Sequence, residues 1–177
     1  MTPDEYCQQK AAASGSSFYY SFLFLPAERR RAITALYAFC REVDDIADEV
    51  SDVGIARTKL AWWRTEVANL FAGHPRHPVT QALAPFVRPY GLDAARMNEI
   101  IDGMEMDLTH HRYPDFEALR LYCHRVAGVV GQLSASIFGY AMRAAWESWA
   151  MPIVATSTMT RGALKSRRMI VSSSTAP

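Results

Sequence analysis

Three aspartates, Asp44, Asp45 and Asp48, lie in a segment whose apolar residues recur at helical spacing. The apolar positions that match one buried helical stripe are Ile33, Leu36, Tyr37, Cys40 and Val43. Continued by fours, this stripe reaches Asp44 and Asp48, so we expect both carboxylates to point toward the core. Unpaired charges are costly in an apolar interior, so these carboxylates need a counter-charge or a metal. Carboxylate oxygens suit Mg²⁺, which completes its coordination shell with water and substrate phosphates. The segment therefore predicts a magnesium or polar-substrate site.

Further charged candidates flank this segment and recur downstream. Arg41 stands one helical turn before Asp45, a spacing that by itself indicates a surface ion pair. In residues 92–110, Asp102 and Glu105 project away from the apolar stripe, and we expect them to be solvated. Asp107 lies about 20° from Ile100 in helical projection and is the weaker candidate for another inward carboxylate.

The segment 116–140 carries an aromatic candidate, Tyr122, whose hydroxyl needs a partner if it is buried. Packing and a role in a site are both open for this side chain. The residues expected to face inward beside it are Leu119, Cys123, Val126, Val130, Leu133 and Ile137. An adjoining row of small residues, Ala127, Gly131 and Ala135, allows close helix packing or leaves room for a bulky apolar ligand.

These candidates must be positioned by helices, because no run of alternating strands is visible. Thr2 to Glu5 has the pattern of a capping box with Pro at the first helical position. Residues 18–25 fit a strand or a helix, and Pro26 can open the aspartate helix, which should end near Val50. Proline and glycine breaks then separate helices predicted at 55–71, 79–87, 92–110 and 116–140.

Composition limits the class of protein. The 177 residues suffice for one domain, and 50 % hydrophobic content excludes disorder throughout. A net charge of +1 gives no reason to expect a nucleic-acid partner. The three cysteines are far apart and form no zinc or disulfide pattern, which favours a reducing compartment. The first residues show no secretory pattern and no apolar run approaches the ~20 residues of a membrane span, so we expect a cytoplasmic protein.

Four ordered motifs resemble the squalene/phytoene synthase family, with the bacterial branch that makes presqualene diphosphate the nearest. They are the segment 17–26, the segment 37–48, Asp102-Gly-Met-Glu-Met-Asp-Leu108, and the segment 122–131. The resemblance implies an all-α isoprenoid synthase bundle that joins two farnesyl diphosphates head to head with Mg²⁺. The head-to-tail prenyl transferases are disfavoured, because Glu49 to Gly54 stands where an Arg-Arg pair is expected.

The resemblance also implies a role for each matching side chain. Asp44, Asp45 and Asp48 would bind metal, while Arg41 and Ser17 would contact diphosphate. Phe18 and Phe22 would line the pocket, and Tyr37 and Tyr122 would be the catalytic tyrosines. These motifs do not distinguish farnesyl from geranylgeranyl diphosphate as the substrate. The product is strongly apolar, which is compatible with peripheral contact at the inner membrane face.

The sequence departs from the family pattern in one respect, so membership of the family does not by itself imply catalytic activity. The family carries a second aspartate-rich helix after the Tyr122 helix, and here no aspartate follows Asp115. We therefore expect residues 1–140 to form the N-terminal part of the bundle, about five to six helices, and 141–177 to form an aperiodic tail, disordered or read in another frame. The hypotheses are a prenyltransferase, completed by a partner chain, or a catalytically silent helical protein that binds prenyl diphosphate or a partner subunit. Exposed apolar stripes would favour oligomers.

Overall fold

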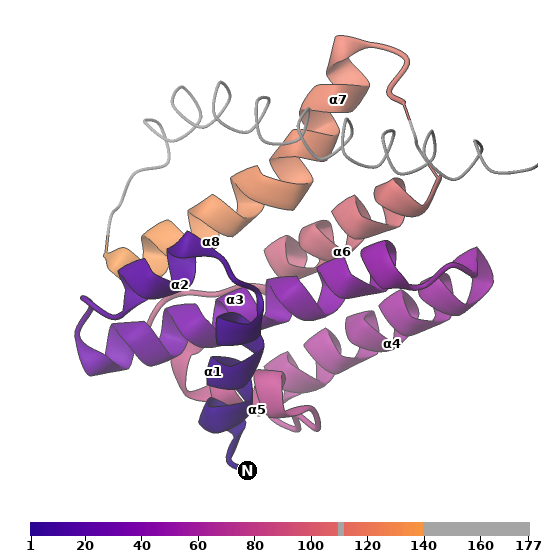
Figure 1. The fold of residues 1–177 in the computed structure, drawn as a ribbon. Helices are drawn as coiled ribbons and strands as arrows, with labels where there is room; N and C mark the ends of the chain where they lie inside the picture. The colour runs from indigo at the N-terminus through magenta and orange to yellow at the C-terminus, as the bar shows by residue number, and fades with distance from the viewer. Residues whose placement is uncertain (110–111, 140–177) are drawn as a thin grey trace, which may run out of the picture.

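The computed structural model describes residues 1–109 and 112–139, and within these ranges every regular element is helical (Figure 1). The all-α prediction is thus confirmed. The elements are α1 (Pro3–Ala13), α2 (Ser17–Phe22), α3 (Ala27–Glu49), α4 (Val53–Ala72), α5 (Pro78–Leu83), η1 (Ala84–Phe86), α6 (Ala94–Thr109), α7 (Phe116–Cys123), η2 (His124–Gly128) and α8 (Val129–Phe138). The expected aperiodic tail lies outside the described residues.

The helix ends follow the local sequence. Thr2 and Glu5 form the predicted capping box of α1, with the Glu5 carboxylate 2.7 Å from the Thr2 backbone nitrogen. Asp52 caps α4, and Gly73 ends it in the left-handed conformation at φ 85°, which glycine adopts without strain. Residues 18–25, which fitted strand or helix, contain the short helix α2.

The predicted single helix over 116–140 is interrupted. A π-helical turn, η2, separates α7 from α8 over His124–Gly128. A π turn holds more residues than an α turn, so it rotates the side chains that follow. After the turn, Val129, Leu133 and Ile137 are buried, whereas Val130, which was also expected to face inward, is only partly buried.

The core is organised around α3, the longest helix (Figure 1). It packs against α1, α4, α5, α6 and α8, so its buried side chains link most of the described helices. The largest fully buried apolar side chains are Phe39, Leu36, Leu60, Leu83, Met97, Ile100, Ile101, Leu133 and Ile137. None of the described helices combines the length and apolarity needed to cross a bilayer.

Candidate functional site

The guanidinium of Arg41 joins two of the predicted aspartates on α3. Its Nη1 donates to Asp44 Oδ2 and its Nη2 donates to Asp45 Oδ1. The other oxygen of Asp45, Oδ2, lies 2.8 Å from the Lys10 ammonium on α1. The side chains of Asp44 and Asp45 are 15 % and 19 % exposed. The ion pair that helical spacing indicated is therefore one part of a half-buried network between two helices.

Asp48 does not point inward, and that expectation is wrong. Asp48 is exposed, whereas Asp44 is partly buried. A step of four residues advances the stripe by about 40° because the helix turns every 3.6 residues, so Asp48 lies about 120° from Leu36. The buried stripe of α3 instead alternates steps of four and three through Phe39, Val43 and Ile46.

The aromatic candidates near α2 divide into a buried and an exposed group. The Tyr37 hydroxyl donates to Ser14 Oγ at 3.0 Å, and its ring meets that of Phe22 edge to face at 5.8 Å. Phe22 is buried, while Ser17 is exposed and Phe18 is 68 % exposed. Tyr37 and Phe22 therefore form a packed wall, and Ser17 and Phe18 lie on the open side of α2.

The structure brings together two candidates that are fifteen positions apart, Asp107 on α6 and Tyr122 on α7. The buried Tyr122 hydroxyl donates to Asp107 Oδ2 at 2.8 Å. The ring of Tyr113 stacks on Tyr122 at 4.9 Å between centroids. Burial, aided by the Asp107 charge, raises the pKa of Tyr113 above its ordinary range, so this hydroxyl stays protonated. Asp107 is partly buried, and its hydrogen bond ties α6 to α7.

Asp102 and Glu105 are not simply solvated, as expected from their place on α6. Arg64 of α4 donates to Asp102 Oδ1 and, at 2.9 Å, to Glu105 Oε2. Both carboxylates are partly buried between the helices. Helical projection missed this link because it relates residues within one helix, and Arg64 belongs to another. Lys10 was missed for the same reason.

Whether the predicted magnesium site is chemically reasonable depends on the oxygen ligands that the aspartates offer. The carboxylate oxygens of Asp44, Asp45 and Asp48 are ligands of the type that Mg²⁺ prefers. However, no three histidine, cysteine, aspartate or glutamate side chains gather as a metal-binding group within 1–109 and 112–139. The aspartates thus fit an ion that takes few protein ligands and completes its shell with water and phosphate.

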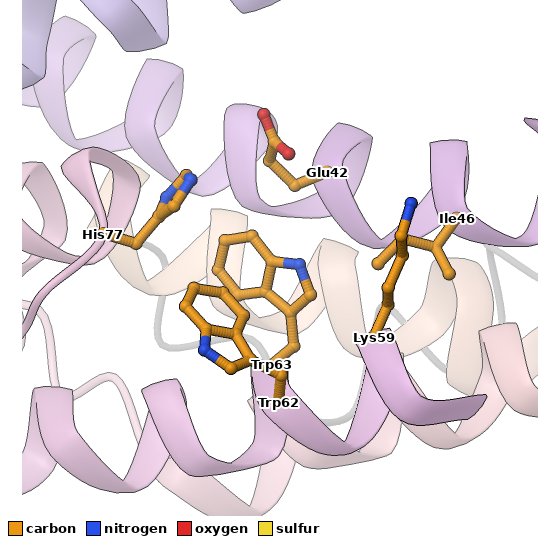
Figure 2. A pocket seen from close by; sticks show the side chains of 6 residues that line it. All are labelled: Glu42, Ile46, Lys59, Trp62, Trp63 and His77. Carbon is orange, nitrogen blue, oxygen red and sulfur yellow. The ribbon is translucent and has the colours of Figure 1, made fainter. Parts of the chain in front are cut away.

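A hollow of about 260 Å³ lies between α3, α4 and the turn before α5 (Figure 2). Its lining consists of Glu42, Ile46, Lys59, Trp62, Trp63 and His77. Figure 2 shows the two indoles in the middle of the lining and the imidazole to one side of them, and the ring centroids of Trp63 and His77 are 4.8 Å apart. Burial lowers the pKa of His77, which favours its neutral form. None of the predicted site residues lines this hollow, but Glu42 of its lining is bound by Lys10, which also pairs with Asp45.

Comparison with known proteins relates the chain to enzymes of isoprenoid metabolism. The family model described as squalene/phytoene synthase matches residues 11–154. The chain is 36 % identical over 137 residues to a phytoene synthase of Arthrospira platensis, covering 77 % of this chain and 44 % of that protein. It is 38 % identical over 135 residues to a chloroplastic phytoene synthase of Daucus carota, covering 76 % and 34 %.

Solved structures show the same arrangement of helices. Squalene synthase HpnC from Alicyclobacillus acidocaldarius superposes with a TM-score of 0.70 at 30 % identity, covering 80 % of this chain and 53 % of that one. A dehydrosqualene synthase in complex with ligand gives 0.69 at 26 % identity, covering 76 % and 47 %. The fold is thus the isoprenoid synthase helical fold, and the chain spans about half or less of the length of these relatives.

Proposed function

Because the chain belongs to the squalene/phytoene synthase family, we propose that it binds an isoprenoid diphosphate beside α3 and serves the head-to-head joining of two such molecules. The family is one of prenyltransferases. We assign farnesyl diphosphate as the substrate and presqualene diphosphate as the product. Geranylgeranyl diphosphate is the competing substrate, since the relatives compared above include phytoene synthases as well as squalene and dehydrosqualene synthases.

The observation that carries this proposal is the position of Arg41 between Asp44 and Asp45. A guanidinium is a planar fork that binds phosphate as readily as carboxylate. When Arg41 turns from Asp44 to a diphosphate, the Asp44 oxygen becomes available, with Asp48 one turn away on the same helix. Mg²⁺ held by these oxygens would neutralise charge on the departing diphosphate.

The aromatic side chains would protect and steady the allylic cation left by the diphosphate. Tyr37 and Phe22 pack edge to face and exclude water from that side of α2. The Tyr122 ring offers a π face, and its hydroxyl is fixed by Asp107, so neither needs to reorganise when charge develops. On the solvent-exposed side of α2, Phe18 would contact the prenyl chain and Ser17 would contact the diphosphate.

The test is release of inorganic pyrophosphate from farnesyl or geranylgeranyl diphosphate, with Mg²⁺ present or chelated. We expect turnover of farnesyl diphosphate that stops on chelation and falls by about 100-fold or more in Asp44→Asn, as for loss of a charge-stabilising group. Asp52→Asn is the matched control, because asparagine caps α4 as well as aspartate does. Equal rates with and without Mg²⁺, or an active Asp44→Asn variant, would refute the proposal.

A catalytically silent binder is the second candidate. It is favoured by the sequence, in which no aspartate follows Asp115 to supply the second aspartate-rich helix of the family. It predicts that farnesyl thiodiphosphate, which resists ionisation, binds in calorimetry while the diphosphate is not turned over. Binding would be weakened by Asp44→Asn. We also propose a cytoplasmic location with peripheral contact at the inner membrane face, which sedimentation with lipid vesicles would test.

A further inference from the structure

Helix α1 reaches the proposed site almost entirely through polar contacts. Only Cys7 and Ala11 of this helix are buried. Its other links to α3 are the Tyr6 hydroxyl on Glu42 at 2.7 Å, Lys10 on Glu42 at 3.1 Å and on Asp45 at 2.8 Å, Asp4 on Arg31 at 2.8 Å, and Ser14 on Tyr37 at 3.0 Å. Because only two small side chains of α1 are buried, these polar contacts carry much of the attachment of α1 to α3. One of them, from Lys10, also reaches a residue of the proposed site.

The Lys10 contact determines what Asp45 can do. Asp45 Oδ1 accepts from Arg41 and Asp45 Oδ2 meets the Lys10 ammonium, so both oxygens of this carboxylate are occupied by cations. A carboxylate held in this way is a fixed counter-ion and a poor ligand for a third cation. Asp44 also accepts from Arg41, through its Oδ2, and Asp48 is exposed one turn further along α3.

We propose that Lys10 is a positioning residue: through Asp45 it holds the Arg41 fork in the orientation that receives the diphosphate, and it keeps Asp45 out of the metal shell. This inference rests on the proposed function. Three carboxylates, Glu42, Asp44 and Asp45, face two cations, Lys10 and Arg41. Without Lys10 the Asp45 carboxylate loses the ion pair on its Oδ2, so Asp45 turns more freely and the Arg41 fork is no longer held in one orientation.

The environment of Lys10 supports a permanent charge. Burial works against the ammonium, but the hydrogen bonds and charges of Asp45 and Glu42 raise its pKa above the ordinary value. The Lys10 side chain is only 26 % exposed, so solvent screens these contacts less than those of a free surface pair. Lys10 therefore remains protonated wherever the two carboxylates are ionised.

The experiment measures binding of farnesyl thiodiphosphate by calorimetry at several Mg²⁺ concentrations. We expect Lys10→Met to weaken binding by about threefold to tenfold, the range of a partly buried ion pair, and Lys10→Arg to restore it. Lys59→Met is the control for the loss of one lysine, because Lys59 lies on α4 and lines the hollow with Glu42, whereas Lys10 pairs with Asp45. Unchanged binding by Lys10→Met, or loss without rescue by Lys10→Arg, would overturn the inference.

A double-mutant cycle separates positioning from simple docking of α1. The cycle compares the free energy of binding of farnesyl thiodiphosphate among the variants. If Lys10 acts through Asp45, the effects of Lys10→Met and Asp45→Asn on this binding are non-additive, whereas those of Lys10→Met and Glu42→Gln are additive. The reverse result shows that Lys10 only attaches α1 to Glu42 and overturns the inference.

The Arg41 Nε–H signal in ¹⁵N NMR gives a readout without ligand. We expect this signal to show an ordered Arg41 guanidinium in the unmodified chain and a mobile one in Lys10→Met. If the unmodified chain fails to bind the thiodiphosphate, the proposed function fails, while an equally ordered Arg41 in Lys10→Met refutes the positioning role by itself.

Discussion

Glu66 is a buried carboxylate that fixes the turn between α4 and α5. It is 1 % exposed, and its Oε1 accepts hydrogen bonds from the backbone nitrogens of Arg76 and His77 and from the Thr80 hydroxyl, at 2.6 to 2.7 Å. Asn69 donates to the other oxygen at 3.2 Å. Burial alone would raise the pKa of Glu66, but these hydrogen bonds lower it below the ordinary 4.5. The charged form is therefore the one that the fold stabilises.

The lowered pKa predicts a loss of stability in acid. The contribution of Glu66 is fully present above pH 4.5, where the unfolded chain also ionises, and it is lost as the pH falls through the lower pKa of the folded state. Glu66→Gln should reduce the free energy of unfolding by about 1–3 kcal/mol at pH 7 and flatten this acid dependence. Urea unfolding between pH 7 and pH 3 measures both, with exposed Glu49→Gln as the control. An unchanged pH profile in Glu66→Gln would contradict the assignment.

At the scale of elements, Gly103 lets α6 pack closely against the π-helical turn η2. A Cβ at this position would lie 2.8 Å from Val126 Cγ1 and 3.0 Å from Arg125 Cβ. Neither atom is the free end of a flexible chain, so a side chain at Gly103 forces the two elements apart. Asp107 lies one turn after Gly103 on α6, and Tyr122 lies on α7 about one turn before Val126, so the hydrogen bond from Tyr122 to Asp107 is close in sequence to this contact.

Gly103→Ala should therefore be destabilising despite the better helix propensity of alanine. Propensity contributes up to about 1 kcal/mol in favour of the variant, and overpacking costs about 1–3 kcal/mol, so we expect a net loss near 1 kcal/mol. Thermal unfolding measures the loss, and near-ultraviolet circular dichroism reports the displaced Tyr113 and Tyr122 rings. A variant as stable as the unmodified chain, with unchanged tyrosine signals, would show that α6 and η2 are not in tight contact.

These elements also show what local sequence can and cannot predict. The capping box at Thr2 and the glycine after α4 were predictable, because caps depend on residues within one turn. The π turn was not, since nothing in the segment 124–128 differs from an ordinary helix and the turn is fixed by packing on α6. The link from Arg64 to Asp102 was also beyond reach, because it joins residues 38 positions apart.

For the candidate site, the sequence predicted contacts within one helix better than contacts between helices. The pairing of Arg41 with Asp45 was correct because both lie on one helix. The inward direction of Asp48 was wrong, because repeated steps of four drift around the helix axis. The meeting of Asp107 with Tyr122 depends on how α6 and α7 are arranged, which spacing within one helix does not encode.

At the scale of the whole molecule, large apolar side chains gather on two exposed segments. Phe18, Tyr20 and Phe24, on or just after α2, are 68 %, 62 % and 91 % exposed, and Phe116 and Leu121 of α7 are 66 % and 45 % exposed. Single exposed apolar residues are ordinary, but neighbouring aromatic side chains on one short element favour contact with another surface. Their exposure makes self-association the expected behaviour of the isolated chain.

We predict that the chain associates as its concentration rises and that the double variant Phe24→Ser, Phe116→Ser does so only at higher concentration. Burying one phenylalanine contributes about 1.5–3 kcal/mol, so removing two should raise the association midpoint by ~10-fold or more. Sedimentation velocity over a concentration series measures the midpoint. Ile55→Ser is the matched control, because Ile55 is 53 % exposed but lies on α4, away from both segments. A monomer at every concentration, or an equal shift with Ile55→Ser, would mean that α2 and α7 do not form the contact, and the open side of α2 would then be left to the prenyl ligand.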